Sequence, residues 1–343
     1  MSFPFKPKIA GWELTRRCNY RCLHCGTSCG PPRDDEMSFE RSIQMIDELA
    51  DLGCEIINLS GGEPLMHPHW DKFAEKMKER NITPYMITNG YYIEEQLDRI
   101  LKSPLRRIGI SVDGDEEMHN HIRQNNEAYK RVISASKILK QHGVSVGAIS
   151  HVSKYNLPLL EHMYNEFLQI PMDFWQIQIT FASGRMKDHS DRVLDPPQLI
   201  QIAQFMEEKR KENKLMVCVG DNLGYYSQYQ IVDAPWKGCH AGRWVAGIEA
   251  DGTIKGCLSL PPEFHEMNLK EHSFKDIWEN PQSFKYNRYF NPEDMTGSCA
   301  NCEKTNDCRG GCRVTAFNTT GNIYNNPYCL FRVEKEIAKK NEI

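Results

Sequence analysis

The first two thirds of the chain alternate between short apolar runs, typical of buried strands, and longer stretches with an apolar residue every three or four positions, typical of amphipathic helices. The stretch 39–52 shows the helical pattern most clearly, because Ile43, Ile46 and Leu49 share one face and Gly53 follows the last turn. The predicted strands cover 9–15, 55–60, 83–88, 107–112, 145–152 and 174–180, and the predicted helices cover 39–52, 69–80, 93–102, 128–142, 157–168 and 197–213.

Strands that alternate with helices predict an α/β fold with a parallel sheet, either barrel-like or doubly wound. In both architectures, binding and catalytic residues gather at the carboxyl ends of the strands. The alternation fades near residue 220, where Gly, Pro, Asn and Cys become frequent. We therefore expect a first domain over 1–219 and a second over 220–343, in which metal ligation would add the stability that a sparse apolar pattern lacks.

Composition narrows the class of protein without naming a reaction. The chain has 343 residues, of which 40% are hydrophobic, and this is enough to bury a sizeable core. With a net charge of −4 and no block of basic residues, we expect neither a nucleic-acid partner nor adsorption to a membrane. No apolar segment resembles a signal peptide or is long enough to cross a bilayer, so we expect a cytoplasmic protein.

Thirteen cysteines are unusual for a cytoplasmic chain. Reducing compartments disfavour disulfides, so clustered cysteines there indicate metal binding. Most of them lie in two groups, one near the start of the chain and one in its last third. Cys54 and Cys218 lie apart from both groups in apolar surroundings, and we expect them to be buried as small hydrophobic residues.

The first group follows the first predicted strand. Cys18, Cys22 and Cys25 have the spacing C-x₃-C-x₂-C. Three thiolates hold three irons of a [4Fe–4S] cube and leave the fourth iron open to a small chelator. A structural zinc site, with Cys29 or His24 as the fourth ligand, is the alternative.

The cysteine motif resembles the signature of the radical S-adenosylmethionine (SAM) superfamily, and three later segments agree with it. Segment 61–64 (GGEP) follows the second predicted strand, and segments 88–90 (TNG) and 110–114 (ISVDG) follow the next two. The resemblance covers about residues 9–219 and implies a partial (βα)₆ TIM-like barrel whose open iron binds SAM. An electron from the cluster then cleaves SAM to a 5′-deoxyadenosyl radical, which takes a hydrogen atom from the substrate.

The same resemblance assigns the contacts to SAM. The GGEP segment would bind the amino group, since an ammonium needs acceptors and glycines let the backbone approach closely. Arg123, which follows His119, would either pair with the SAM carboxylate or be an ordinary solvated helix arginine. The residues expected to bind SAM are Gly61, Gly62, Glu63, Pro64, Asn89, Ser111, Asp113 and Arg123.

The second cysteine group is as distinctive as the first. Its members are Cys239, Cys257, Cys299, Cys302, Cys308, Cys312 and Cys329. A pair of zinc ribbons would lack one ligand unless His240 supplied it. The spacing resembles the SPASM extension of certain radical SAM enzymes, which implies two auxiliary [4Fe–4S] clusters and therefore three clusters in total.

By this resemblance the outer auxiliary cluster is bound by Cys299, Cys302, Cys308 and Cys329, and the inner one by Cys239, Cys257 and Cys312. The inner cluster then has an open iron, a non-cysteine ligand, or Cys218 as its fourth ligand. An Asp-Gly turn within 247–257 predicts a hairpin that would bring Cys239 near Cys257.

SPASM relatives commonly modify ribosomally made peptides, so a peptide is the first expected substrate. Only 17 residues precede Cys18, so leader recognition would need a separate leader-peptide-binding protein or another surface. The alternative is a small molecule, such as a sugar or nucleoside derivative, that undergoes epimerisation, dehydrogenation or decarboxylation. Leu258 occupies the position where the sulfatase-maturing branch has an acidic base, which argues against that reaction.

Electrons would come from a flavodoxin- or ferredoxin-type protein. A cluster scaffold or electron carrier without SAM chemistry is a further alternative, against which the GGEP segment argues. No catalytic acid or base is assigned. Weaker candidates for substrate contact or proton transfer, for most of which packing is the simpler explanation, are Gln176, Gln178, Arg185, Tyr225, Tyr226, Tyr229, Asp233 and Glu249.

Overall fold

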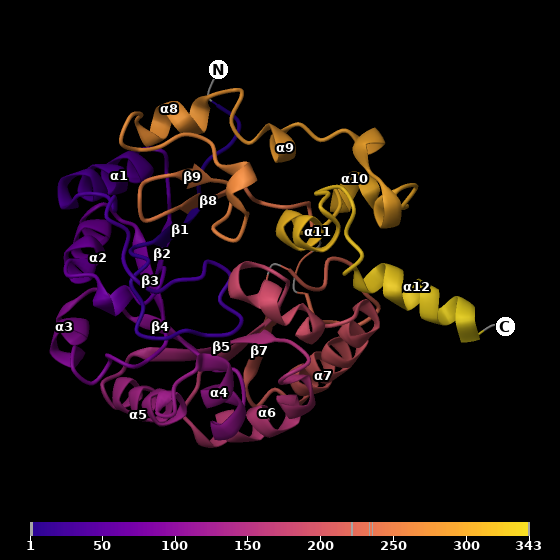
Figure 1. Cartoon of the computed structure of the whole chain (residues 1–343), viewed down its shortest axis with the longest axis horizontal. Coiled ribbons are helices and arrows are strands. Elements are labelled where there is room, and N and C mark those ends of the chain that lie inside the picture. The colour runs from indigo at the N-terminus through magenta and orange to yellow at the C-terminus, as the bar shows by residue number, and fades with distance from the viewer. Residues whose placement is uncertain (1–2, 221, 233, 235, 342–343) are drawn as a thin grey trace.

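The computed structural model describes residues 3–220, 222–232, 234 and 236–341. A nine-stranded sheet runs through them in the order β7-β6-β5-β4-β3-β2-β1-β8-β9. Neighbours from β7 to β8 pair in parallel, and β9 pairs antiparallel with β8. The sheet curves, and the helices that connect its strands lie along its outer side (Figure 1).

The strands are β1 (Ile9–Glu13), β2 (Ile56–Ser60), β3 (Thr83–Thr88), β4 (Arg107–Ser111), β5 (Ser145–Val152), β6 (Phe174–Ile179), β7 (Met216–Val219), β8 (Val245–Ile248) and β9 (Ile254–Lys255). The α-helices are α1 (Phe39–Asp51), α2 (Trp70–Glu79), α3 (Leu97–Lys102), α4 (Glu116–Arg123), α5 (Ala128–Gln141), α6 (Leu160–Gln169), α7 (Leu199–Glu212), α8 (Phe274–Glu279), α9 (Lys285–Arg288), α10 (Thr305–Cys308), α11 (Arg313–Thr320) and α12 (Leu330–Asn341).

The predicted α/β class is confirmed, and the strand order decides between the two architectures. From β1 to β7 the strands follow their order in the chain, without the reversal of a doubly wound sheet. The fold is therefore an open arc of a (βα) barrel. It has one βα strand more than predicted, since β7 at the edge is only four residues long and carries little pattern.

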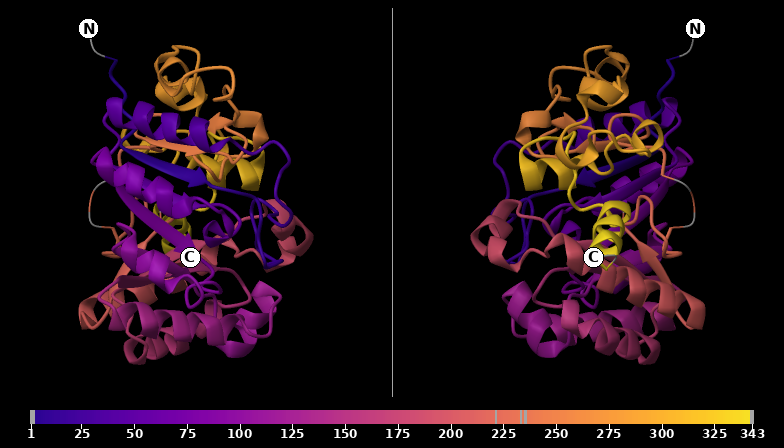
Figure 2. Two further views of the ribbon diagram at one scale, coloured as in Figure 1. Left: turned by 90° about the vertical axis from the view of Figure 1, so that its left-hand side faces the viewer. Right: turned by 90° about the vertical axis from the view of Figure 1, so that its right-hand side faces the viewer.

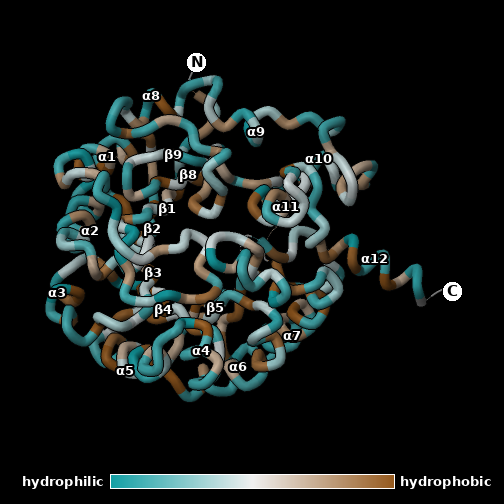
Figure 3. Tube along the Cα trace, in the orientation of Figure 1, coloured by the Kyte–Doolittle hydropathy of each residue, from teal (hydrophilic) through white to brown (hydrophobic). Residues whose placement is uncertain are grey.

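Apolar residues explain why these elements pack as they do. In β1, Ala10 and Trp12 are buried toward the helices, and the Trp12 ring lies 4.9 Å from that of Phe73 in α2. Gly11 and Glu13 alternate with them and face the inner side of the arc. Hydrophobic residues are frequent along β4 and β5, and hydrophilic residues are frequent around the outer rim of the molecule (Figure 3).

The C-terminal third completes the ring that the barrel leaves open. Strand β8 pairs in parallel with β1, in a register that places Ile9 opposite Val245. Helices α8 and α12 pack against α1 and α7, so this third closes the space between the two ends of the arc (Figures 1 and 2). The domain boundary at residue 219 stays a prediction, but one sheet continues across it.

The hairpin predicted within 247–257 is confirmed as β8 and β9, which pair Gly247 with Lys255. Gly252 in its turn has a φ of 89°, a conformation that favours glycine. None of the helices formed by the described residues has the length and apolar character needed to span a bilayer.

Candidate active site

The first three cysteines lie together in the loop that leaves β1. Cys22 is buried, and Cys18 and Cys25 are half-buried beside Tyr20 and Tyr91. Burial raises the pKa of Cys18 to about 12, and the neighbouring thiolates of Cys22 and Cys25 add to this shift. Such mutual repulsion is relieved when the thiolates bind a cationic centre, as an iron–sulfur cluster requires.

Cys29, which lies outside the C-x₃-C-x₂-C spacing, is in contact with this group. Its thiol is buried, lies 3.0 Å from the Thr27 hydroxyl and interacts with Cys25. A hydrogen bond from Cys29 is the largest cause of the fall in the pKa of Cys25 to about 4. Cys29 therefore supports the Cys25 thiolate.

Arg185 holds the cysteine loop from the segment that follows β6. Its Nε donates to the Cys22 carbonyl (2.8 Å), its Nη1 to the Cys29 carbonyl (2.9 Å) and its backbone N–H to the Cys25 carbonyl (3.1 Å). A Cβ on the preceding Gly184 would lie 2.3 Å from the Cys25 carbonyl oxygen. Arg185, one of the weaker candidates for substrate contact, positions the loop, in agreement with the simpler structural explanation.

The two glycines of GGEP lie against the backbone of the same loop. The Gly62 N–H donates to the Thr15 carbonyl (2.8 Å), and a Cβ on Gly62 would lie 2.2 Å from the Arg17 carbonyl oxygen. Gly61 has a φ of 128°, and a Cβ there would lie 2.5 Å from the Thr15 oxygen. Only glycine allows this close approach. Pro64 begins a short 3₁₀ helix and is buried.

Glu63 is enclosed and links the ends of two strands. Its Oε1 accepts hydrogen bonds from the Leu65 N–H (3.1 Å) and the Thr88 hydroxyl (2.7 Å), and its Oε2 accepts one from the Asn89 N–H (2.8 Å). The residue has no exposed surface, and burial raises its pKa to about 7. Glu63 thus holds the ends of β2 and β3 together, and its contact with the SAM amino group stays a prediction.

Asn89 connects the third strand to the cysteine loop, since its Nδ2 donates to Asn19 Oδ1 (2.8 Å). Ser111 ends β4, one strand further along the same edge, and is half-buried. The predicted SAM residues thus come from the carboxyl ends of adjacent strands, next to the cysteines.

Asp113 and Arg123 form a buried ion pair beside the cysteines. Asp113 Oδ2 lies 2.5 Å from Arg123 Nη2 and 3.2 Å from His24 Nε2, and Arg123 Nη1 lies 3.8 Å from Cys22 Sγ. Burial alone would raise the pKa of Asp113, but Arg123 and His24 hold it well below its usual range. Arg123 is only 7% exposed, so the solvated-arginine alternative is wrong.

The seven later cysteines separate into the two predicted groups. Burial raises the pKa of Cys312 to about 12, and the thiolates of Cys239 and Cys257 add to the shift. Burial also raises the pKa of Cys329 to about 11, with contributions from Cys299 and Cys302. The corresponding neighbours of Cys308 are Cys329 and Cys299.

Among the described residues, no group of three or more His, Cys, Asp or Glu side chains is tight enough to hold a single metal ion. The predicted ligands in all three groups are thiols, the donors that iron–sulfur clusters take, so the residues present fit the predicted clusters.

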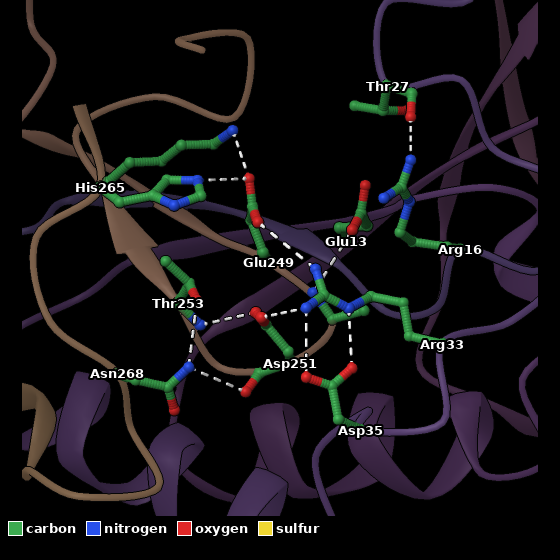
Figure 4. A network of polar contacts seen from close by, with 12 residues as sticks. Glu13, Arg16, Thr27, Arg33, Asp35, Glu249, Asp251, Thr253, His265 and Asn268 are labelled. Carbon is green, nitrogen blue, oxygen red and sulfur yellow. Dashed lines mark hydrogen bonds and ion pairs between the residues drawn. The ribbon is translucent and has the colours of Figure 1, made fainter. Parts of the chain in front are cut away.

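A network of charged side chains joins the first cysteine loop to the β8–β9 hairpin (Figure 4). Arg33 Nη2 lies 2.6 Å from Asp251 Oδ2, and Glu249 Oε1 lies 2.6 Å from Lys255 Nζ and 3.1 Å from His265 Nε2. Although burial opposes it, Lys255 and then His265 lower the pKa of Glu249. Glu249, a candidate base, is thus an ionised member of this network.

Glu13 was not predicted as a site residue. It ends β1, is buried, and its Oε1 accepts a long hydrogen bond (3.4 Å) from the Ala250 N–H of the hairpin. Burial and the neighbouring Glu249 raise its pKa to about 7. Two carboxyls with pKa values pushed apart in this way are suited to acid–base work. Its position at the end of the strand before the cysteines was the signal available in the sequence.

The remaining candidates have varied settings. Gln176 and Gln178 alternate in β6 with buried Trp175 and Ile177 and so face the inner side of the arc. Tyr225 is buried beside Cys312, as the packing explanation predicts. Tyr226 donates to the Trp236 carbonyl, Tyr229 accepts from Gln204, and Asp233 lies outside the described residues.

Comparison with known proteins agrees with this geometry. Residues 12–168 match the profile of the radical SAM superfamily. Residues 239–303 match that of the SPASM iron–sulfur cluster-binding domain. The chain belongs to the radical SAM superfamily. It is an enzyme that binds SAM and a [4Fe–4S] cluster in its radical SAM domain and auxiliary iron–sulfur clusters in its SPASM domain.

Two relatives match this radical SAM protein over nearly their whole length. An "AdoMet-dependent heme synthase" of Methanosarcina barkeri is 27% identical, over 96% of this chain and 98% of the relative. An "Fe-coproporphyrin III synthase" of the same organism is 24% identical, over 97% of this chain and 90% of the relative.

Solved structures of other radical SAM proteins share the fold. Streptococcus suis SuiB bound to S-adenosylmethionine superposes with a TM-score of 0.76 at 16% identity, over 94% of this chain and 76% of that one. Native anSMEcpe with bound AdoMet gives a TM-score of 0.72 at 16% identity, over 96% of both chains. At this identity they support the architecture alone.

Proposed function

We propose that this radical SAM enzyme acts on a small molecule of the porphyrin class, in a reaction that belongs to heme formation. The observation that carries the proposal is the similarity to heme synthases along nearly the full length of both chains, across both cysteine groups. It favours the small-molecule alternative over the peptide that was expected first. A leader-peptide-binding partner has no support from these relatives.

The inner side of the arc offers contacts that suit such a substrate. A Cβ on Gly11 would lie 3.1 Å from Leu258 Cδ1, so the Leu258 side chain covers β1 where the sulfatase-maturing branch has its acid. A porphyrin has an apolar ring and carboxylate arms, and Leu258 supplies an apolar contact for the ring. Glu13, on the same strand, supplies a carboxyl group that exchanges a proton near neutral pH.

The auxiliary clusters suit a substrate that must lose an electron. Bound SAM supplies the radical that removes one hydrogen atom from the substrate. For decarboxylation of a carboxylate arm, that hydrogen atom goes to the 5′-deoxyadenosyl radical, carbon dioxide leaves, and the remaining electron passes to an acceptor. An auxiliary cluster is such an acceptor, and an electron-transfer protein would carry the electron onward.

Stimulation of SAM cleavage tests the substrate class. Anaerobically reconstituted enzyme is given SAM, a strong reductant and, in separate reactions, Fe-coproporphyrin III, metal-free coproporphyrin III or a peptide fraction of host extract. We expect 5′-deoxyadenosine to rise with a porphyrin, and the porphyrin to lose mass corresponding to one carbon dioxide and two hydrogen atoms for each arm that reacts. Stimulation by a protease-sensitive fraction alone would restore the peptide interpretation.

A further inference from the structure

The short helix α9 is hydrogen-bonded to the segment that contains Cys239, the first cysteine of the inner group. Asn287 Nδ2 donates to the carbonyl oxygens of Cys239 (2.7 Å) and Ala241 (2.8 Å). Arg288 Nε donates to the Gly242 carbonyl (2.7 Å). These hydrogen bonds therefore hold α9 next to Cys239.

Tyr286, the residue before this pair, turns its ring toward the same cysteines. It packs against the cluster of buried residues that contains Cys239 and Cys312, and its ring lies 5.0 Å from that of Phe264. A Cβ on Gly256, the residue before Cys257, would lie 2.3 Å from the Tyr286 hydroxyl oxygen. The glycine therefore makes room for the hydroxyl next to a predicted cluster ligand.

The Tyr286 hydroxyl is buried and donates to no acceptor among the described residues, whereas the Gly256 N–H acts as a donor toward its oxygen. Such a group is costly in a folded protein unless something satisfies it. The charged groups that act most strongly on this hydroxyl include the thiolates of Cys239 and Cys257. Thiolate sulfur accepts hydrogen bonds, and both residues become thiolates when they bind iron.

We propose that the Tyr286 hydroxyl donates a hydrogen bond to a cysteine sulfur of the inner auxiliary cluster and raises the reduction potential of that cluster. A hydrogen bond to cluster sulfur stabilises the reduced state, which carries one more negative charge. Tyr286 is then the non-cysteine group at the inner cluster, acting through a ligand rather than as one. This inference rests on assigning Cys239, Cys257 and Cys312 to the inner cluster, and it is independent of the substrate.

Redox titration followed by EPR tests the proposal without any turnover. The full-length chain carries Cys18→Ala, Cys22→Ala and Cys25→Ala, so that only the auxiliary clusters contribute signals. Tyr286→Phe is compared with Tyr289→Phe, which removes a hydroxyl from a residue that is 56% exposed just after the same helix. We expect Tyr286→Phe to lower the potential of one auxiliary cluster and leave the other unchanged, and Tyr289→Phe to change neither.

Unchanged potentials in Tyr286→Phe, with iron content equal to that of the parent, would overturn the proposal. Loss of one cluster's iron in Tyr286→Phe would also contradict it, because the hydroxyl is assigned a tuning part and phenylalanine keeps the ring. The redox titration does not depend on whether porphyrins stimulate SAM cleavage. The proposal for Tyr286 and the proposal of a porphyrin substrate can therefore be refuted independently.

Discussion

At the scale of single residues, two buried carboxyl groups at strand ends have unusual protonation behaviour. Glu13 ends β1 and Glu63 follows β2, and the pKa of each is raised to about 7. They differ in their partners: Glu63 accepts three hydrogen bonds, whereas the Ala250 N–H of the hairpin, at 3.4 Å, is the donor found for Glu13. We therefore expect replacement by glutamine to have different effects at Glu13 and at Glu63, although both carboxyl groups have the same pKa shift.

Glu13→Gln is expected to flatten the pH dependence of stability. The folded-state pKa of about 7 lies above the ordinary value of 4.5, so Glu13 contributes stability below about pH 4.5 that is lost as the pH rises through 7. Removing this titration changes the pH dependence of the free energy of unfolding by on the order of 3 kcal/mol between pH 4.5 and 8. Urea unfolding at pH 5 and pH 8 measures it.

Glu55→Gln is the matched control, because the Glu55 side chain is 62% exposed and lies just before β2. A Glu13→Gln variant with the same pH dependence as the parent would show that Glu13 titrates normally.

Glu63→Gln is expected to lower both stability and affinity for SAM. An amide in place of the carboxylate turns one acceptor toward a donor, either the Asn89 N–H or the pair formed by the Leu65 N–H and the Thr88 hydroxyl. We expect a loss of about 1–3 kcal/mol of unfolding free energy. Thermal unfolding and SAM binding by equilibrium dialysis check it, and an unchanged SAM affinity would refute the positioning part of Glu63.

At the scale of elements, the cysteine loop depends on the segment after β6. Arg185→Ala removes two side-chain hydrogen bonds to carbonyls of the loop, and Arg185→Lys loses the fork that reaches both. We expect both variants to lose iron from the SAM cluster faster in the presence of a chelator, and the auxiliary clusters to stay. Arg192→Ala is the control, since Arg192 ends the 3₁₀ helix Gly184–Arg192 that contains Arg185, and its side chain is 51% exposed. Equal iron loss in all three variants would contradict the proposal that Arg185 holds the cysteine loop in place.

Sequence patterns predicted the long elements because apolar periodicity is local. They missed α4, where the buried face includes His119 and Arg123 and so hides the period. Cysteine spacing predicted the first group, whose three members lie in one loop, and the SPASM resemblance assigned the members of the two later groups. It did not predict Arg185, Cys29 or Tyr286, because their contacts depend on how distant segments pack.

At the scale of the whole molecule, one sheet links the first cysteine group to the inner one. The cysteine loop leaves β1, β8 pairs with β1, and Cys257 lies two residues after β9, so the predicted SAM site and inner cluster site share neighbouring strands. This continuity explains how Glu13, on β1, contacts the hairpin of the SPASM region.

The proposed reaction is tested most directly by following hydrogen transfer from a porphyrin that is labelled with deuterium on its carboxylate arms. We expect the labelled atom to appear in 5′-deoxyadenosine by mass spectrometry, and no 5′-deoxyadenosine from the chain with Cys18→Ala, Cys22→Ala and Cys25→Ala. Unlabelled 5′-deoxyadenosine would contradict a porphyrin substrate attacked on these arms. Continued SAM cleavage by the triple variant would contradict the assignment of the SAM cluster itself.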